Sequence, residues 1–170
     1  MYHISIYFDD KSDSIIRNYY RTVEASTDNT YLQDNNVPPH ITLAVFNTTN
    51  EVAAIEAFFK VKSEFDEGSI TWVSVGGLGN SVLCIVPVYN EYLHNLNEMV
   101  HKYISDISDI QNDNRYNAFN WFPHATIGKT LTPEQQGRGF CAMQKQFGKF
   151  ESRAVRIGLA KTNPYREIQP

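Results

Sequence analysis

Cysteine is scarce in this sequence, and long apolar runs are missing from it. Only two cysteines occur among the 170 residues, Cys84 and Cys141. Two are too few for a disulfide framework, and no close cysteine pair suggests a zinc site. No apolar stretch is long enough to span a bilayer, and no basic segment followed by an apolar one opens the chain. We therefore expect a cytoplasmic protein with no membrane partner.

Positive charge is not in excess either. The formal net charge is −4 at pH 7, whereas a protein that binds nucleic acid regardless of its sequence needs a large basic surface. This leaves a small or short anionic ligand, held by a few local cations. Apolar residues are plentiful, since 42% of the chain is hydrophobic and 13% is aromatic. That is enough for the core of one domain, or of two small lobes that share a cleft.

Hydrophobic periodicity and turn signals predict the same order of elements twice along the chain. The first half is expected to contain strand 2–8, a helix capped by Ser12 or Asp13, polar loop 26–36, strand 40–46, a helix from Asn50 and strand 70–75. The second half is expected to contain strand 81–86, a helix from Asn90, polar loop 108–120, a strand that His124 enters, a helix from the capping box at Thr132 and strand 153–160. Between them, residues 76–80 are glycine-rich but lie between two strands and lack the dinucleotide-binding spacing, which predicts a hairpin loop.

Each half contains one short motif of the form Pro-His-apolar-Thr. The two copies are Pro39-His40-Ile41-Thr42 and Pro123-His124-Ala125-Thr126. Proline fixes its own φ and favours an extended residue before it, so each histidine is expected to enter a strand. Side chains alternate between the two faces of a strand, so the histidine and the threonine of each motif share one face. An imidazole with a hydroxyl two residues on, presented twice, is suited to handling a phosphate.

The repeated order predicts an α+β fold with two similar lobes. Each lobe would be an antiparallel sheet with outer helices, and a pseudo-twofold axis around a central cleft would relate them. The histidines are 84 positions apart, close to half of the chain, and a duplication accounts for this most simply. We expect one bilobal domain over residues 1–170, with lobes of approximately 1–78 and 79–170. The two histidine faces would then meet in the cleft, where ligands commonly bind.

These motifs, His40-Ile41-Thr42 and His124-Ala125-Thr126, resemble those of the 2H phosphoesterase superfamily. This group includes the LigT-like 2′-5′ RNA ligases and the cyclic phosphodiesterases. The resemblance implies metal-independent and cofactor-free cleavage or transfer at a ribose-linked phosphodiester. Implied substrates are 2′,3′-cyclic phosphates, ADP-ribose cyclic phosphates and 2′-5′-linked oligonucleotides. It also implies that His40 and His124 are the catalytic pair, and that Thr42 and Thr126 bind the phosphate.

Two histidines suit this chemistry because imidazole titrates near pH 6.5. One neutral ring can take a proton from the attacking oxygen, while one protonated ring gives a proton to the leaving oxygen. Two threonine hydroxyls can donate hydrogen bonds to the non-bridging oxygens. The sequence does not assign the acid and the base to particular histidines, because that depends on how the substrate is oriented.

Other residues are weaker candidates. Phe122 lies two positions before His124 and could stack on a base, and Tyr7 could line the cleft; core packing is the alternative for both. Arg156 and Lys161 could supply positive charge near the cleft, or be ordinary solvated cations. The remaining histidines are expected to be incidental, on a polar strand face or on a solvent-facing side of a helix: His3, His94 and His101.

Two other classes of protein compete with this interpretation. A non-catalytic nucleotide-binding or RNA-binding module could use the same cleft without turnover, although binding alone needs no acid–base pair. A metalloenzyme is the other, but two histidines without a nearby carboxylate or cysteine cluster make a poor zinc site. As an enzyme, the protein is expected to act as a monomer on a small nucleotide or a short oligonucleotide.

Overall fold

The computed structural model describes residues 1–162 and 165–170. Within these residues the chain forms one eight-stranded sheet in the order β5-β2-β1-β7-β3-β4-β6, with β8 paired to β7. Every pair of neighbouring strands is antiparallel. The strands are β1 (Tyr2–Phe8), β2 (His40–Asn47), β3 (Gly68–Leu78), β4 (Val82–Pro87), β5 (Gln111–Asn112), β6 (Ala125–Gly128), β7 (Phe150–Lys161) and β8 (Arg166–Gln169).

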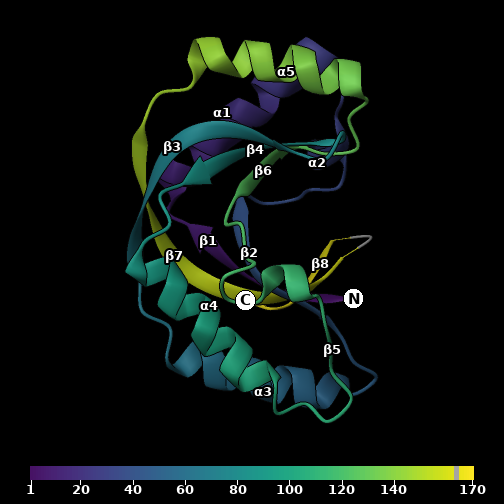
Figure 1. Ribbon diagram of the computed structural model, residues 1–170, viewed down its shortest axis with the longest axis vertical. Helices are drawn as coiled ribbons and strands as arrows, with labels where there is room; N and C mark the ends of the chain where they lie inside the picture. Colours follow the sequence, from purple (N-terminus) through teal and green to yellow (C-terminus); the bar gives the residue numbers. More distant parts are fainter. Residues whose placement is uncertain (163–164) are drawn as a thin grey trace.

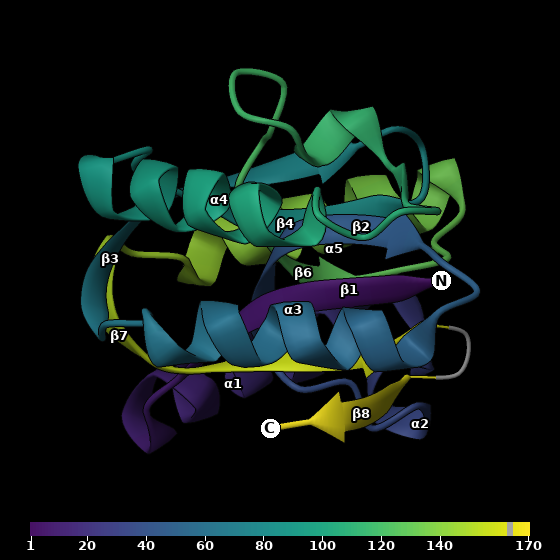
Figure 2. The same ribbon diagram turned by 90° about the horizontal axis from the view of Figure 1, so that it is seen from below.

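Helices cover the sheet in two pairs. The helices are α1 (Asp10–Thr27), α2 (Tyr31–Asp34), α3 (Glu51–Ser63), α4 (Glu91–Ile104), α5 (Pro133–Gln146) and the short 3-10 helix η1 (Asn114–Tyr116). Helices α1 and α5 lie together at one end of the molecule, and α3 and α4 at the other (Figure 1). Figure 2 shows α3 and α4 running side by side, with strands behind them. The predicted α+β class, with an antiparallel sheet and outer helices, is confirmed.

The division into lobes differs from the one expected at residue 78. Each helix pair takes one helix from the first half of the chain and one from the second, so the halves 1–78 and 79–170 are interleaved. The strands also join into one sheet instead of one sheet per lobe, because the long strand β7 pairs with β1 over one part of its length and with β3 over the other. The physical reason is that the apolar stripe of each helix packs against a helix from the other half of the chain: α1 packs against α5, and α3 packs against α4.

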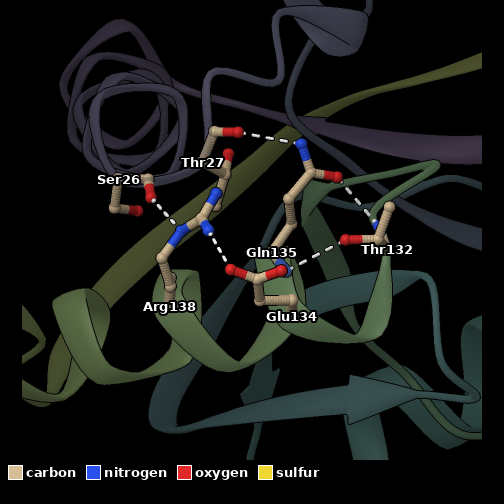
Figure 3. Close-up of polar contacts among 6 residues, drawn as sticks. All are labelled: Ser26, Thr27, Thr132, Glu134, Gln135 and Arg138. Atoms are coloured by element: carbon tan, nitrogen blue, oxygen red, sulfur yellow. Dashed lines mark hydrogen bonds and ion pairs between the residues drawn. The ribbon is translucent and has the colours of Figure 1, made fainter.

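The start of α5 shows how the two halves are joined (Figure 3). Thr132 and Gln135 form the predicted capping box, in which the Thr132 hydroxyl accepts from the Gln135 amide and the Gln135 side chain accepts from the Thr132 amide. The Gln135 side-chain nitrogen also donates to the Thr27 carbonyl, at 2.8 Å, and Arg138 Nε donates to the Ser26 carbonyl, at 3.0 Å. Both carbonyls are at the end of α1, where helix carbonyls lack intrahelical partners.

The helix starts are set by short polar side chains. Asn50 caps α3 and Asn90 caps α4, as predicted, each by accepting from a backbone amide three residues on. For α1 the prediction of Ser12 or Asp13 as the cap is wrong, because Asp9 accepts from the Ser12 amide at 2.8 Å and the helix begins at Asp10. The polar loop expected at 26–36 contains the single turn of α2.

The predicted hairpin loop lies between β3 and β4, although it is shorter than residues 76–80. Strand β3 continues through Leu78, and the turn is made by Gly79, Asn80 and Ser81. Gly79 has a φ of 55°, a left-handed conformation that glycine adopts without a steric penalty. Gly79 also lies on the wall of a large cleft, which is the site of interest.

Candidate active site

The two motifs are on strands that lie next to each other without pairing. β2 begins at His40, β6 begins directly after His124, and the two strands are in contact across the inside of the curved sheet. The four predicted catalytic residues, His40, Thr42, His124 and Thr126, all line one cleft of about 540 Å³. The structure therefore brings together residues 84 positions apart in the sequence.

Both motif strands depart from a regular ladder at the same place. On β2, Ile4 pairs with Ala44 while Ser5 pairs with Thr42, so Leu43 is an extra residue. On β6, Leu83 pairs with Gly128 while Cys84 pairs with Thr126, which makes Ile127 the extra residue. A β-bulge of this kind re-aims the side chains beyond it and is frequent beside active sites.

The bulge changes which residues of β2 face the cleft. His40 and Thr42 share the cleft face, as the alternation predicts. Beyond the bulge, Val45 takes the next position on that face, whereas Ala44 is part of the buried core. The pairing on β1 agrees, because Val45 lies opposite His3, another residue of the cleft.

The two motif histidines have the same hydrogen-bonding arrangement. His40 Nδ1 lies 2.7 Å from the Pro38 carbonyl oxygen, and His124 Nδ1 lies 2.8 Å from the Phe122 carbonyl oxygen. A carbonyl can only accept, so each Nδ1 carries a proton and donates it. In the neutral ring this leaves Nε2 as a bare lone pair, the form that a general base requires.

The surroundings keep both rings neutral in the free protein. Burial lowers the pKa of His40 to about 4, the Pro38 carbonyl acts in the opposite direction, and His124 adds a further lowering. Burial also lowers the pKa of His124. A bound phosphate reverses this effect, because a nearby negative charge favours the protonated imidazole. The pair is thus set to take up a proton together with an anionic ligand.

The backbone of the first motif is fixed from outside the sheet. On the outer edge of β2, the Trp121 indole nitrogen donates to the Thr42 carbonyl at 2.9 Å, and the Asn97 side chain donates to the Leu43 carbonyl at 2.9 Å. Trp121 comes just before the second motif, so its hydrogen bond ties the two motifs directly together. Asn97 also donates to the Tyr116 carbonyl.

The cations of the cleft are not the ones that the sequence suggested. Lys129 and Arg115 line it, and Lys129 is close enough to lower the pKa of His40. Arg156 instead pairs with Glu167 on β8 and covers the Tyr7 ring. Lys161 pairs with Glu51, at the start of α3. Sequence reasoning missed Lys129, although it follows the second motif by three positions, and Arg115, which lies in a segment without periodicity. Aromatic side chains also line the cleft: Tyr31, Tyr116 and Tyr165.

The two predicted substrate-binding aromatics differ in their placement. Tyr7 is 4% exposed and belongs to the core behind His40, with its ring centroid 6.1 Å from that of His40. Its hydroxyl bonds with that of Tyr165 at 3.0 Å, so Tyr7 supports the site and does not line it. Phe122 is 46% exposed, and its ring stacks on His124 at 6.0 Å, which places it where a bound base could reach it.

The three histidines expected to be incidental also differ. His3, which was expected to be incidental on a polar strand face, is buried and lines the cleft, with its ring centroid 5.6 Å from that of His40. His101 is partly buried and bonds to the Tyr116 carbonyl, so it has a structural role. His94 bonds to the Tyr89 hydroxyl and lies outside the residues that line the cleft.

Residues 1–162 and 165–170 contain neither a metal-binding cluster nor a membrane-spanning helix. In this part of the chain, no group of three or more His, Cys, Asp or Glu side chains is arranged to hold a metal ion. Over the same residues, every helix is too short or too polar to cross a membrane.

Comparison with known proteins places these observations in a wider group. A family model described as the 2′-5′ RNA ligase superfamily matches residues 16–166. The structure is similar to one described as a phosphoesterase, with a TM-score of 0.64 and 13% identity over 99% of this chain and 94% of that one. It is equally similar to E. coli LigT complexed with 3′-AMP, with a TM-score of 0.64 and 14% identity over 99% and 94% of the two chains. Kluyveromyces marxianus Usb1 follows with a TM-score of 0.51 and 10% identity over 99% and 97%. A search of curated protein sequences finds no match.

Proposed function

Because the chain belongs to the 2′-5′ RNA ligase superfamily, we propose that it is a metal-independent phosphodiesterase that acts on a ribose-linked phosphodiester. The substrate is a 2′,3′-cyclic phosphate or a 2′-5′-linked oligonucleotide, and catalysis uses two histidines and no cofactor. The observation that carries this proposal is the convergence of both His-x-Thr pairs on one cleft, with both Nε2 atoms left for substrate.

The reaction needs one proton removed and one proton supplied. One imidazole Nε2 takes the proton of the attacking oxygen as the new O–P bond forms, and the other gives its proton to the leaving oxygen as the old P–O bond breaks. In a 2′-5′ linkage the neighbouring 3′-hydroxyl is the nucleophile, and in a cyclic phosphate it is water. His40 and His124 serve as this pair, and substrate orientation decides which is the acid.

The threonines and the cleft cations stabilise the negative charge on the non-bridging oxygens of the phosphate. Thr42 and Thr126 lie two residues after the histidines on the same strand faces, where their hydroxyls can donate to the non-bridging oxygens. Lys129 adds positive charge on the same wall of the cleft. Arg115 is paired with Asp113 at 2.6 Å and is largely exposed, so it acts at the rim.

The dimensions of the cleft support a small nucleotide or a short oligonucleotide. Its volume of about 540 Å³ lies in the range of sites for small molecules and cofactors. Three tyrosines on its wall and Phe122 near its edge offer ring faces for bases. Structures of LigT hold 3′-AMP and NADP⁺ in this fold, which agrees with a ligand of this kind. We propose that the protein acts as a monomer in the cytoplasm.

The test measures the turnover of candidate substrates by the purified wild-type protein and by the variants His40→Ala and His124→Ala. The substrates are a 2′,3′-cyclic mononucleotide, a linear 2′-5′ dinucleotide and a cyclic oligonucleotide, each with and without EDTA. Each variant should lose roughly 10²–10⁴-fold in kcat while its circular dichroism spectrum and Tm stay near those of the wild type. His94→Ala is the matched control and should keep full activity, because His94 lies away from the cleft.

Three outcomes would contradict the proposal. Near-normal turnover in either cleft variant would remove that histidine from the mechanism. Loss of wild-type activity in EDTA would indicate a metalloenzyme. Binding of all three ligands without turnover would indicate a nucleotide-binding or RNA-binding module that uses the same cleft.

A further inference from the structure

A third histidine is connected to the first motif by hydrogen bonds. His3 Nδ1 lies 2.8 Å from Ser5 Oγ, and Ser5 Oγ lies 3.4 Å from Thr42 Oγ1. Ser5 and Thr42 are direct cross-strand partners on β1 and β2, so the sheet itself holds this contact. His3 is 3% exposed and Ser5 is fully buried. His3 and Thr42 line the cleft, and the proposed reaction uses Thr42 but assigns no task to His3 or Ser5.

The direction of these hydrogen bonds follows from the other ring nitrogen of His3. His3 Nε2 is buried, and no partner for it is found among the described residues. A buried N–H without an acceptor is the less tolerated arrangement, since orphaned donors are rarer in proteins than under-satisfied acceptors. The proton of the neutral ring is therefore on Nδ1 and is donated to Ser5 Oγ. Ser5 in turn donates to Thr42 Oγ1, which leaves the Thr42 proton for an oxygen in the cleft.

We propose that His3 is a positioning residue that acts through Ser5 to point the Thr42 hydroxyl proton at the bound phosphate. The proposal rests on the proposed function, because it assigns a task in the same site. Burial, together with the nearby positive charge that His40 can carry and that of Lys129, lowers the pKa of His3 to about 3. The ring therefore stays neutral and keeps its single proton when His40 takes up a proton. The contact between Ser5 and Thr42 is long in the free protein, as is common for catalytic hydrogen bonds before substrate binds.

The second motif lacks this array. The cross-strand partner of Thr126 is Cys84, whose thiol donates to the Gly76 carbonyl at 3.4 Å instead. Val82 stands two residues before Cys84, where the first motif has His3 two residues before Ser5. The two threonines thus have equivalent positions but different neighbours. Of the two, only Thr42 accepts a hydrogen bond from a serine hydroxyl on the neighbouring strand. Cys84 provides the matched control.

The experiment compares Ser5→Ala, His3→Leu, His3→Asn and Cys84→Ala, with Thr42→Ala and the double variant Ser5→Ala/Thr42→Ala. Turnover of a 2′,3′-cyclic mononucleotide gives kcat and KM, and calorimetry gives the affinity for adenosine 3′-monophosphate. Ser5→Ala and His3→Leu should lower kcat about tenfold, the weight of one hydrogen bond, with KM changed less than about twofold. His3→Asn should keep most of the activity, since an amide nitrogen can replace Nδ1 as the donor. Cys84→Ala should match the wild type.

Two further readouts separate orientation from a loss of packing. In the Thr42→Ala background, Ser5→Ala should cause no additional loss, because the group that Ser5 orients is already gone. Nitrogen-15 NMR of the wild type should show His3 neutral with its proton on Nδ1 at pH 7. Full activity in His3→Leu or Ser5→Ala, additive losses in the double variant, or a proton on Nε2 would each overturn the proposal. If the wild type hydrolyses none of the substrates, the proposed function fails. In that case two results still test whether His3 and Ser5 orient the Thr42 hydroxyl. The first is the His3 tautomer. The second is the affinity for adenosine 3′-monophosphate, which Ser5→Ala should lower several-fold when Thr42 is present and leave unchanged in the Thr42→Ala background.

Discussion

His3→Leu and His3→Asn each remove a buried ionisable group whose titration is linked to folding. His3 has an ordinary pKa of about 6.5 in the unfolded chain and a pKa of about 3 in the folded protein, mainly because it is buried. The unfolded state therefore binds more protons than the folded state at every pH between these values. The folded state keeps the full contribution of neutral His3 above pH 6.5 and loses it progressively as the pH falls toward 3.

The magnitude follows from about 1.36 kcal/mol per pH unit below 6.5. Between pH 7.5 and pH 5 the loss attributable to His3 is about 2 kcal/mol of unfolding free energy. His40 contributes in the same direction, since its pKa is also lowered by burial. The wild type therefore loses the sum of both effects over this range, whereas the variants at position 3 lose about 2 kcal/mol less.

Urea unfolding at the two pH values, followed by tryptophan fluorescence, measures this difference. For each protein, the compared quantity is the unfolding free energy lost between pH 7.5 and pH 5. Any effect of the substitution on packing that is the same at both pH values therefore cancels. His94→Ala is the control, because His94 is only partly buried and lies on the surface of α4. An equal loss in the wild type and in both His3 variants would refute the reasoning, because it would show that His3 titrates alike in the folded and unfolded chains.

Two further substitutions probe the surroundings of the second motif. Phe122→Ala removes the exposed ring that stacks on His124; the KM for a 2′-5′ dinucleotide should rise roughly fivefold or more, at about 1–3 kcal/mol per stacked base. Phe59→Ala, an equally exposed phenylalanine on α3, should leave KM alone, and the same KM in both variants would exclude stacking. Trp121→Phe removes the indole donor of the Thr42 carbonyl. It should cost about 1–2 kcal/mol of unfolding free energy by urea titration, because a partly buried carbonyl loses its partner; an unchanged midpoint and slope of the urea transition would contradict this role.

The sequence predicted the structure best where a motif repeats and where a side chain hydrogen-bonds to backbone groups a few residues away. The two His-x-Thr motifs, the capping box at Thr132 and the asparagine caps of α3 and α4 are all local, and each lies where it was predicted. The shared face of His40 and Thr42 follows from alternation alone. The bulge at Leu43 does not, and neither do the hydrogen bonds that Asn97 and Trp121 donate to the Leu43 and Thr42 carbonyls.

Residues that act through distant partners were harder to assign. His3 was expected to be incidental because the side of β1 that it shares with Ser5 is polar. That side instead lines the cleft, where the His3 ring lies near those of His40 and Tyr165. Arg156 is held by Glu167 on β8, in a pairing that no local pattern announces. The interleaving of the helices was missed for the same reason, since element order says nothing about which helices are neighbours.

This interleaving constrains how the polypeptide matures during synthesis. Helix α1 packs against α5, which is made more than a hundred residues later. Until then the apolar stripe of α1 has no permanent cover, and contacts between such distant segments form slowly because a long loop must close first. The nascent protein therefore stays incompletely folded until α5 has emerged. A chain that ends before residue 133 would be a target for chaperones and proteases.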